Sequence, residues 1–280
     1  MKYRYWILLL YLHAFLISAC SSTPPVNERI SNTRELASRA SFTERLISTP
    51  AFELLSFGKG LGKPSDTLVV YIEGDGHAWK TASLPSNNPT PINPLALRLA
   101  MQDTRSAVAY LARPCQFVSL PSRNCSEAVW TFARFSPAVV DAMNEAVNKL
   151  KKDYGAKNLI LVGYSGGGAI AVLVAAKRSD VQALMTVAGN LDTDAWVRLY
   201  NLEPLSGSLN PASVANQLRS VPQTHFIGGK DEVIPKAVVQ SYLAKMGSPN
   251  RAKVIELPND GHVCCWGENW GNLLKEVNPH

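Results

Sequence analysis

The sequence has few of the features that mark metal-binding, nucleic-acid-binding or repeat proteins. None of its five cysteines forms a Cys-x-x-Cys pair, so a structural metal site of that kind has no support. Lysine and arginine are scattered, and the net charge of +6 falls to +4 without residues 1–19, which carry Lys2 and Arg4. No internal repeat is evident. We therefore expect no metal, no organic cofactor and no nucleic-acid partner.

The N-terminus carries an apolar stretch, residues 7–17, that is too short to be a comfortable membrane span and follows two basic residues. This pattern predicts a signal peptide over residues 1–19. The segment Leu16-Ile17-Ser18-Ala19-Cys20 resembles a bacterial lipobox, which implies that Cys20 is acylated (palmitate among its chains) and anchors the protein to a membrane. Because Ser21 and Ser22 follow in place of an aspartate, the resemblance favours the outer membrane, facing the periplasm. An ordinary signal peptide with an incidental cysteine is the alternative.

The mature chain divides into a short polar segment and one domain. Residues 20–41 are rich in Ser, Thr, Pro, Asn and Arg, which predicts a tether, and residues 42–280 have the length of a single domain. In that domain short apolar runs alternate with helical patterns, which favours an α/β fold with a mostly parallel sheet. The predicted strands are 68–72, 107–111, 158–162, 183–187, 224–227 and 252–257, with a weaker pair within 44–57, and the predicted helices are 94–102, 137–154, 168–177 and 236–246.

A serine stands at the junction of a predicted strand and a predicted helix. The residues Gly163-Tyr164-Ser165-Gly166-Gly167 follow the apolar run 158–162 and precede a small-residue apolar run. This context is typical of the nucleophile elbow of a serine hydrolase, where crowding requires glycine two residues before and after the serine. A dinucleotide-binding reading of residues 166–171 would need an acidic residue about 20 positions later at the end of a second strand, and none is placed there.

The order of these elements, the elbow and two later motifs resemble the α/β-hydrolase superfamily from about residue 45 to the C-terminus. In that superfamily the triad runs Ser, Asp or Glu, then His along the chain. The turn at 228–235, which resembles Gly-x-x-Asp-x-x-x-Pro, points to Asp231 as the acid, with Glu232 as the competitor. The loop after the last predicted strand points to His262 as the base, with His77 as the main rival.

The loop after the first predicted parallel strand is expected to complete an oxyanion hole. The superfamily often has a His-Gly motif there, whereas this chain reads Glu73-Gly74-Asp75-Gly76-His77. We expect the backbone N–H groups of Asp75 and Gly166 to be the donors. A carboxylate facing a developing oxyanion would oppose it. Asp75 must therefore point away, pair with a cation such as Lys80 or Arg113, or take part in substrate selection.

Four cysteines remain after Cys20, and an oxidising periplasm permits three connectivities among them. Cys115 and Cys125 flank a short polar loop and are the favoured pair. Cys264 and Cys265 are adjacent, which leaves either a vicinal disulfide or two thiols.

Together these features predict a lipid-anchored, exported serine hydrolase, most similar to a carboxylesterase, that forms an acyl-enzyme on Ser165. Aromatic and leucine residues in 77–93 and in the lid position, 190–221, favour an apolar or mixed acyl substrate, either a small molecule or lipid-like. The alternative is that these residues only pack the lid onto the body of the domain. Two alternatives stay open. One is a non-catalytic hydrolase-fold lipoprotein that binds or assembles envelope components. The other is an envelope acyltransferase that uses the same triad. The sequence leaves the oligomeric state undetermined.

Overall fold

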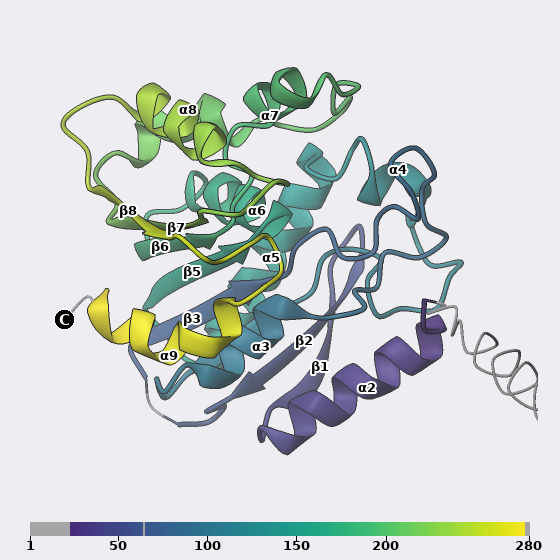
Figure 1. Cartoon of the computed structure of the whole chain (residues 1–280). Coiled ribbons are helices and arrows are strands. Elements are labelled where there is room, and N and C mark those ends of the chain that lie inside the picture. Colours follow the sequence, from purple (N-terminus) through teal and green to yellow (C-terminus); the bar gives the residue numbers. More distant parts are fainter. Residues whose placement is uncertain (1–22, 64, 278–280) are drawn as a thin grey trace, which may run out of the picture.

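The structure is a computed structural model that describes residues 23–63 and 65–277 (Figure 1). Its strands form a single eight-stranded sheet. In chain order the strands are β1 (Thr43–Ser48), β2 (Glu53–Lys59), β3 (Thr67–Ile72), β4 (Val108–Leu111), β5 (Asn158–Tyr164), β6 (Val181–Val187), β7 (Gln223–Gly228) and β8 (Ala252–Leu257).

The strand order across the sheet is β1-β2-β4-β3-β5-β6-β7-β8. The β1–β2 and β2–β4 pairs are antiparallel, and all pairs from β4–β3 to β7–β8 are parallel. The carboxyl ends of the parallel strands therefore share one edge, and the loops after β3, β5, β7 and β8 meet there. In open α/β sheets this edge is where ligands bind.

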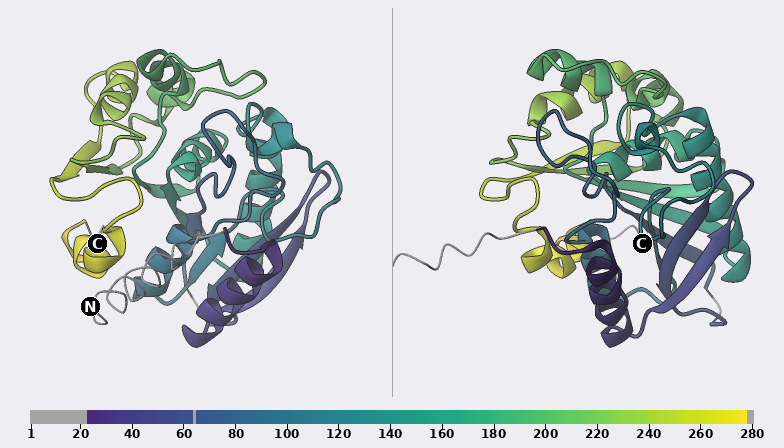
Figure 2. Two further views of the ribbon diagram at one scale, coloured as in Figure 1. Left: turned by 45° about the vertical axis from the view of Figure 1, so that its right-hand side comes forward. Right: turned by 90° about the vertical axis from the view of Figure 1, so that its right-hand side faces the viewer.

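Helices cover both faces of the sheet (Figure 2). One face carries α5, α6 and α8, and the other carries α2, α3 and α9. Each face has its own apolar core. The helices are α2 (Val26–Arg39), α3 (Leu95–Gln102), α4 (Glu127–Trp130), α5 (Pro137–Asp153), α6 (Gly166–Ala175), α7 (Thr193–Tyr200), the 3₁₀ helix η1 (Pro211–Leu218), α8 (Lys236–Met246) and α9 (Trp266–Glu276).

Helix α6 and its strand β5 occupy the centre of the fold. Every residue of α6 is buried, as expected of a helix that is apolar all round. Helix α5 packs beside it and is amphipathic. It begins with Pro137 in its first turn after Ser136, whose hydroxyl accepts a hydrogen bond from the N–H of Val139. The turn between β5 and α6 is therefore held between two buried elements.

The expectation of an α/β-hydrolase fold is confirmed, and the predicted strands and helices lie within a few residues of those observed. The weak strand pair expected within 44–57 corresponds to β1 and β2. The sequence reading missed α9, although Trp266, Trp270 and Leu273 recur at helical spacing and are all buried. Among the helices in the described ranges, none is long and apolar enough to cross a membrane.

The predicted tether over 20–41 is wrong for residues 26–39, which form α2 and belong to the domain. Ile30, Thr33 and Ala37 lie on one face of α2 and are buried, and Arg29 donates a hydrogen bond to the carbonyl of Thr90. Tertiary burial of this face thus orders a segment whose composition is polar. The predicted signal peptide 1–19 and lipidated Cys20 lie outside the described residues.

Candidate active site

Ser165 occupies the sharp turn between β5 and α6. Its φ of 52° lies in the left-handed region, which non-glycine residues rarely adopt. A Cβ atom at Gly163 would collide with the backbone of Gly167, and one at Gly167 would collide with the carbonyl of Ile72. The two glycines around Ser165 are therefore required by backbone contacts, as expected for a nucleophile elbow.

Ser165, His262 and Asp231 form a continuous hydrogen-bonded chain. His262 Nε2 lies 3.0 Å from Ser165 Oγ, and His262 Nδ1 lies 2.9 Å from Asp231 Oδ2. The structure brings His262 to the serine, while His77 lies in the wall of the surrounding cleft. In this arrangement a neutral imidazole with its proton on Nδ1 can accept the serine proton at Nε2.

Asp231 is held in a fixed orientation by the turn after β7. Its Oδ1 accepts hydrogen bonds from the N–H groups of Val233 (2.9 Å) and Ile234 (2.8 Å), which leaves Oδ2 for His262. The Asp231 side chain is fully buried, whereas the competitor Glu232 is exposed. Only Asp231 of this pair contacts the imidazole.

The backbone of His262 is fixed as well. Its carbonyl accepts hydrogen bonds from the Tyr164 hydroxyl (3.2 Å) and the Trp266 indole N–H (3.1 Å). The Tyr164 ring also packs beside the imidazole, with centroids 5.5 Å apart. Neither residue was predicted from the sequence to support the site.

Asp75 and Gly166, the two residues predicted to supply the oxyanion donors, are in close contact. The Asp75 carboxylate is so close to Gly166 that a Cβ atom there would overlap it. Among the described residues, the backbone N–H groups of Asp75 and Gly166 have no hydrogen-bond acceptor, so both are free to bind a substrate oxygen. The first turn of α6 adds its partial positive charge at the same place.

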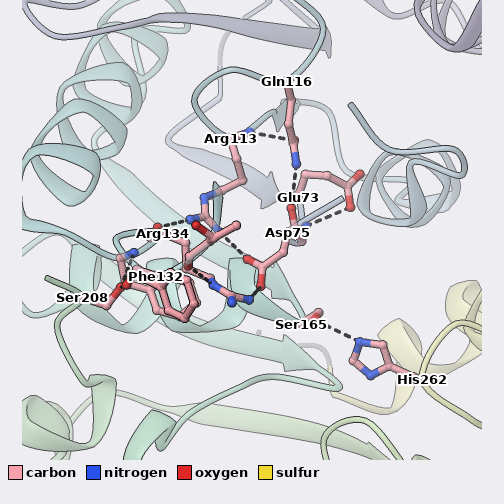
Figure 3. A network of polar contacts seen from close by, with 12 residues as sticks. Glu73, Asp75, Arg113, Gln116, Phe132, Arg134, Ser165, Ser208 and His262 are labelled. Carbon is pink, nitrogen blue, oxygen red and sulfur yellow. Dashed lines mark hydrogen bonds and ion pairs between the residues drawn. The ribbon is translucent and has the colours of Figure 1, made fainter. Parts of the chain in front are cut away.

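The Asp75 carboxylate is turned toward two arginines (Figure 3). Its Oδ1 lies 3.2 Å from Arg113 Nη1 and its Oδ2 lies 2.6 Å from Arg134 Nη1. Burial alone would raise the pKa of Asp75, but the two guanidinium groups outweigh it and hold the pKa below its ordinary value. Lys80, the other cation considered as a partner for Asp75, donates a hydrogen bond to the Asn87 side chain. Pairing with Arg113 was one of the expected solutions, and Arg134 was not foreseen.

Glu73 is a second acid beneath this turn, and it is almost completely buried. Its Oε1 accepts hydrogen bonds from the N–H groups of Gly74 (2.9 Å) and Ala96 (3.4 Å), while its Oε2 has no partner within the described residues. Burial raises the pKa of Glu73 to about 7, although these hydrogen bonds act in the opposite direction. Near neutral pH both the protonated and the ionised form of Glu73 are therefore populated.

This raised pKa predicts a pH-dependent stability. An acid whose pKa is higher in the folded state stabilises the fold fully below its unfolded pKa, and this stability is lost as the pH rises through 7. The shift from 4.5 to about 7 corresponds to about 3 kcal/mol of unfolding free energy. We expect Glu73→Gln to gain about this amount relative to the unaltered protein between pH 4 and pH 8. Urea unfolding of both proteins at the two pH values measures it, and an equal difference at both would contradict the prediction.

Two disulfides lie near the site. Cys115 is joined to Cys125, the pair favoured from the sequence, and Cys264 is joined to Cys265. The sulfur atoms of the second pair and the Glu268 carboxylate lie within 4.8 Å of one another, but cysteines in a disulfide offer no thiolate to a metal. The second disulfide begins two residues after His262, and the carbonyl of Cys264 accepts a hydrogen bond from Gly261 N–H.

Reduction of the Cys264–Cys265 bond is expected to lower activity more than stability. Freed cysteines relax the loop that holds His262, and a displacement of about 1 Å can cost about a hundredfold in rate. Turnover should fall when the mature protein is treated with reductant, and the double variant Cys264→Ser, Cys265→Ser should show the same loss and no further response. Mass spectrometry of the unreduced peptide containing residues 262–266 checks the bond. Two free thiols, together with full activity of the double variant, would overturn this coupling.

Ser165 opens into a cleft of about 440 Å³, here called the Ser165 cleft. A second cavity of about 740 Å³, here called the Phe132 cavity, adjoins it and shares Trp79, Arg134 and Trp196 with it. Part of the walls comes from the loop 77–93 and from α7 with the segment after it, the two regions expected to line the pocket, and Phe132 and Arg134 add to them. The Phe132 cavity is the more apolar, with Phe132, Leu202 and Leu205 in its wall.

Solved structures with the same fold include several hydrolases. A bacterial membrane phospholipase A is 18% identical, with 98% of each chain covered and a TM-score of 0.55. An esterase from Pyrococcus furiosus is 15% identical, with 84% of this chain and 90% of the other covered and a TM-score of 0.57. An α/β serine hydrolase without lid from Xanthomonas campestris is 12% identical, with 85% and 96% covered and a TM-score of 0.53. No curated protein sequence matches the chain.

A sequence model of the dienelactone hydrolase family matches residues 121–263, just over half of the 280 residues. The matched segment contains Ser165, Asp231 and His262, and it begins after the loop that holds Asp75. A lactone is a cyclic ester, so the family name describes the cleavage of an ester bond. The chain therefore belongs to the dienelactone hydrolase family within the α/β-hydrolase superfamily, and it is an ester-cleaving serine hydrolase.

Proposed function

We propose that the protein is a lipid-anchored, exported carboxylesterase that works through an acyl-enzyme on Ser165. The observation that carries this proposal is the hydrogen-bonded chain from Ser165 through His262 to Asp231, at the edge of the sheet where the Ser165 cleft opens. No cofactor takes part in this chemistry.

The first half of the reaction forms the acyl-enzyme. Ser165 Oγ attacks the ester carbonyl while its proton moves to His262 Nε2, and Asp231 stabilises the resulting imidazolium through Nδ1–H. The negative charge on the carbonyl oxygen is bound by the N–H groups of Asp75 and Gly166. His262 then donates its proton to the departing alkoxide, which leaves as the alcohol.

The second half returns the enzyme to its starting state. Water loses a proton to His262 Nε2 and attacks the acyl-enzyme, and collapse of the second tetrahedral intermediate releases the acid and restores Ser165. An alcohol in place of water would make the protein an acyltransferase. The openness of the Ser165 cleft to solvent favours hydrolysis, because half-exposed residues such as His77 and Trp79 line it.

The cavities favour an acyl ester with an apolar part of appreciable length. The Ser165 cleft accommodates the ester group, and the Phe132 cavity beside it, whose wall combines aromatic and leucine side chains with Lys80, Arg134 and Glu203, is large enough for a chain or ring system. The membrane phospholipase among the structural neighbours carries the same fold, which is compatible with a lipid-like ester.

Two measurements test the proposed function together. The purified mature protein should be labelled by a fluorophosphonate probe, and it should hydrolyse a series of 4-nitrophenyl esters from acetate to decanoate. Because each buried methylene stabilises the bound state by about 0.8 kcal/mol, we expect kcat/KM to rise by up to about fourfold per methylene until the cavity is filled. Absence of both labelling and hydrolysis would favour the non-catalytic binding lipoprotein.

The lipid anchor has its own test. We expect Cys20→Ser to move the protein from the membrane fraction to the soluble fraction, because this variant lacks the cysteine that is proposed to carry the acyl chains. Stable anchoring needs more than one such chain. Cell fractionation followed by immunoblotting measures the distribution, with Ser213→Ala, at an exposed position of the domain, as the control that leaves the anchor intact. Retention of the Cys20 variant in the membrane at full strength would argue for a different means of attachment.

A further inference from the structure

Several of the large apolar side chains that are exposed in the described residues lie at or next to the Ser165 cleft and the Phe132 cavity. We call this set the entrance rim, and it consists of Leu84, Ile92, Phe132, Leu199, Leu202 and Val263, each between 37% and 55% exposed. Ile92 and Val263 line the Ser165 cleft, while Phe132 and Leu202 line the Phe132 cavity.

The other two members of the entrance rim flank the cavities without lining them. Leu84 stands between Ser83 and Pro85, which both line the Phe132 cavity, and Leu199 follows Trp196 on α7. By contrast, exposed apolar residues such as Leu46 on β1 and Val254 on β8 belong to the edge strands of the sheet. A concentration of apolar surface of this kind marks an interaction site.

The start of the described chain lies beside the same surface. Thr23 and Val26 line a small pocket together with His77 and Lys80. His77 also lines the Ser165 cleft and Lys80 also lines the Phe132 cavity, so the small pocket at Thr23 shares one side chain with each of the two larger cavities. In Figure 1 the purple start of α2 accordingly lies beside the blue loops below α4.

The distance from Thr23 to the proposed anchor is short. Cys20 precedes Thr23 by three residues, which span at most about 11 Å when fully extended. A bilayer that holds acyl chains on Cys20 must therefore lie close to the corner of the domain where the entrance rim is exposed. Apolar side chains on that corner can enter the boundary between headgroups and acyl chains, as membrane-surface helices do.

We propose that the entrance rim is a membrane-binding surface whose occupant is the lipid bilayer itself, and that the ester substrate enters the Ser165 cleft directly from that bilayer. The proposal rests on the proposed ester hydrolysis and on the anchor at Cys20. It assigns the Phe132 cavity to the apolar part of a lipid ester that has left the bilayer, because this cavity adjoins the Ser165 cleft and has Phe132 and Leu202 of the entrance rim in its wall.

The first test compares two double variants of the mature chain in phosphatidylcholine–phosphatidylglycerol vesicles. Leu84→Asp with Leu199→Asp alters the entrance rim at two positions that do not line the Ser165 cleft. Leu46→Asp with Val254→Asp is the matched control at similarly exposed positions on the edge strands. The substrates are 4-nitrophenyl decanoate dissolved in the vesicles and 4-nitrophenyl acetate in water, which share one leaving group.

We expect the entrance-rim variant to lose at least about tenfold of its activity on the vesicle-borne ester, because charged side chains oppose insertion. Its activity on the acetate should change less than twofold, as should both activities of the control. Equal rates for both variants on the decanoate, or no cleavage of the decanoate by an unaltered protein that cleaves the acetate, would overturn the proposal. If the unaltered protein did not cleave the acetate either, this result would instead refute the proposed esterase activity.

A second test does not depend on catalysis. Leu84→Trp and Leu46→Trp are placed in vesicles whose lipids are brominated along their acyl chains, and the quenching of tryptophan fluorescence beyond that of the unaltered protein is measured. We expect extra quenching for Leu84→Trp only. Equal quenching in both variants would overturn the proposal. If light scattering showed that the aspartate variant of the entrance rim changes the oligomeric state, the entrance rim would be assigned to a second copy of the chain, which would also overturn it.

Discussion

Replacement of Ser165 by alanine is expected to lower the hydrolysis of 4-nitrophenyl esters by at least about 10⁴-fold and to abolish labelling by a fluorophosphonate probe. The physical reason is that no other hydroxyl is hydrogen-bonded to His262 Nε2 in the structure's described residues. In this variant only the residual catalysis that comes from substrate binding and from the free N–H groups of Asp75 and Gly166 would remain.

The folded state should tolerate this change. The alanine removes one hydroxyl from a half-exposed position and keeps the Cβ atom, although the positive φ at this position remains. We expect the urea midpoint to stay close to that of the unaltered protein. Ser213→Ala is the matched control, because its hydroxyl donates to the carbonyl of Asn210 on the surface, far from His262. Undiminished labelling of the Ser165 variant would exclude this serine as the nucleophile.

The sequence was most informative where local geometry alone dictates the residues. The elbow at 163–167 needs glycine at fixed positions because the backbone of α6 approaches β3 and β5 closely, and such a requirement is visible in a single sequence. The convergence of Ser165, Asp231 and His262 follows from the parallel sheet, which brings the loops after β5, β7 and β8 to one edge.

The features that the sequence did not reveal depend on contacts between distant segments. Helix α2 is polar in composition and becomes ordered because Ile30 and Ala37 are buried against the body of the domain. Arg134 lies outside any motif, yet it pairs with Asp75 from a segment 59 residues away. A signal was present all the same, because a carboxylate at an oxyanion hole needs cations nearby, and that requirement suggested Arg113.

The two arginines also resolve the conflict between a carboxylate and an oxyanion at one site. With Arg113 and Arg134 paired to it, Asp75 adds a local charge of −1 to two positive charges, so the cluster is positive overall. The two arginines compensate the charge of this carboxylate, which lies beside Gly166, and the backbone N–H of Asp75 has no other acceptor among the described residues. The departure from the common His-Gly motif is therefore compatible with stabilisation of an oxyanion.

Replacement of His262 by alanine should be the second most damaging change. We expect kcat to fall by about 10³-fold to 10⁵-fold, because the variant has no group that can take the proton from Ser165 Oγ. His77→Ala is the matched control, since His77 lines the same cleft and has no hydrogen bond to the serine among the described side chains. Its loss should alter KM more than kcat, because it removes part of the wall that contacts substrate.

Chemical rescue distinguishes a missing base from a disturbed loop. His262→Ala leaves space for an imidazole next to Ser165 Oγ and Asp231 Oδ2, which lie 3.0 Å and 2.9 Å from the ring nitrogens of the native histidine. Added imidazole should therefore restore part of the activity of His262→Ala, and it should restore none in Asp231→Ala, where the ring is present but poorly oriented. If His77→Ala lost more kcat than His262→Ala and responded to imidazole, His77 would be the base. The hydrogen bonds around Asp231 and the backbone of His262 would then serve structure alone.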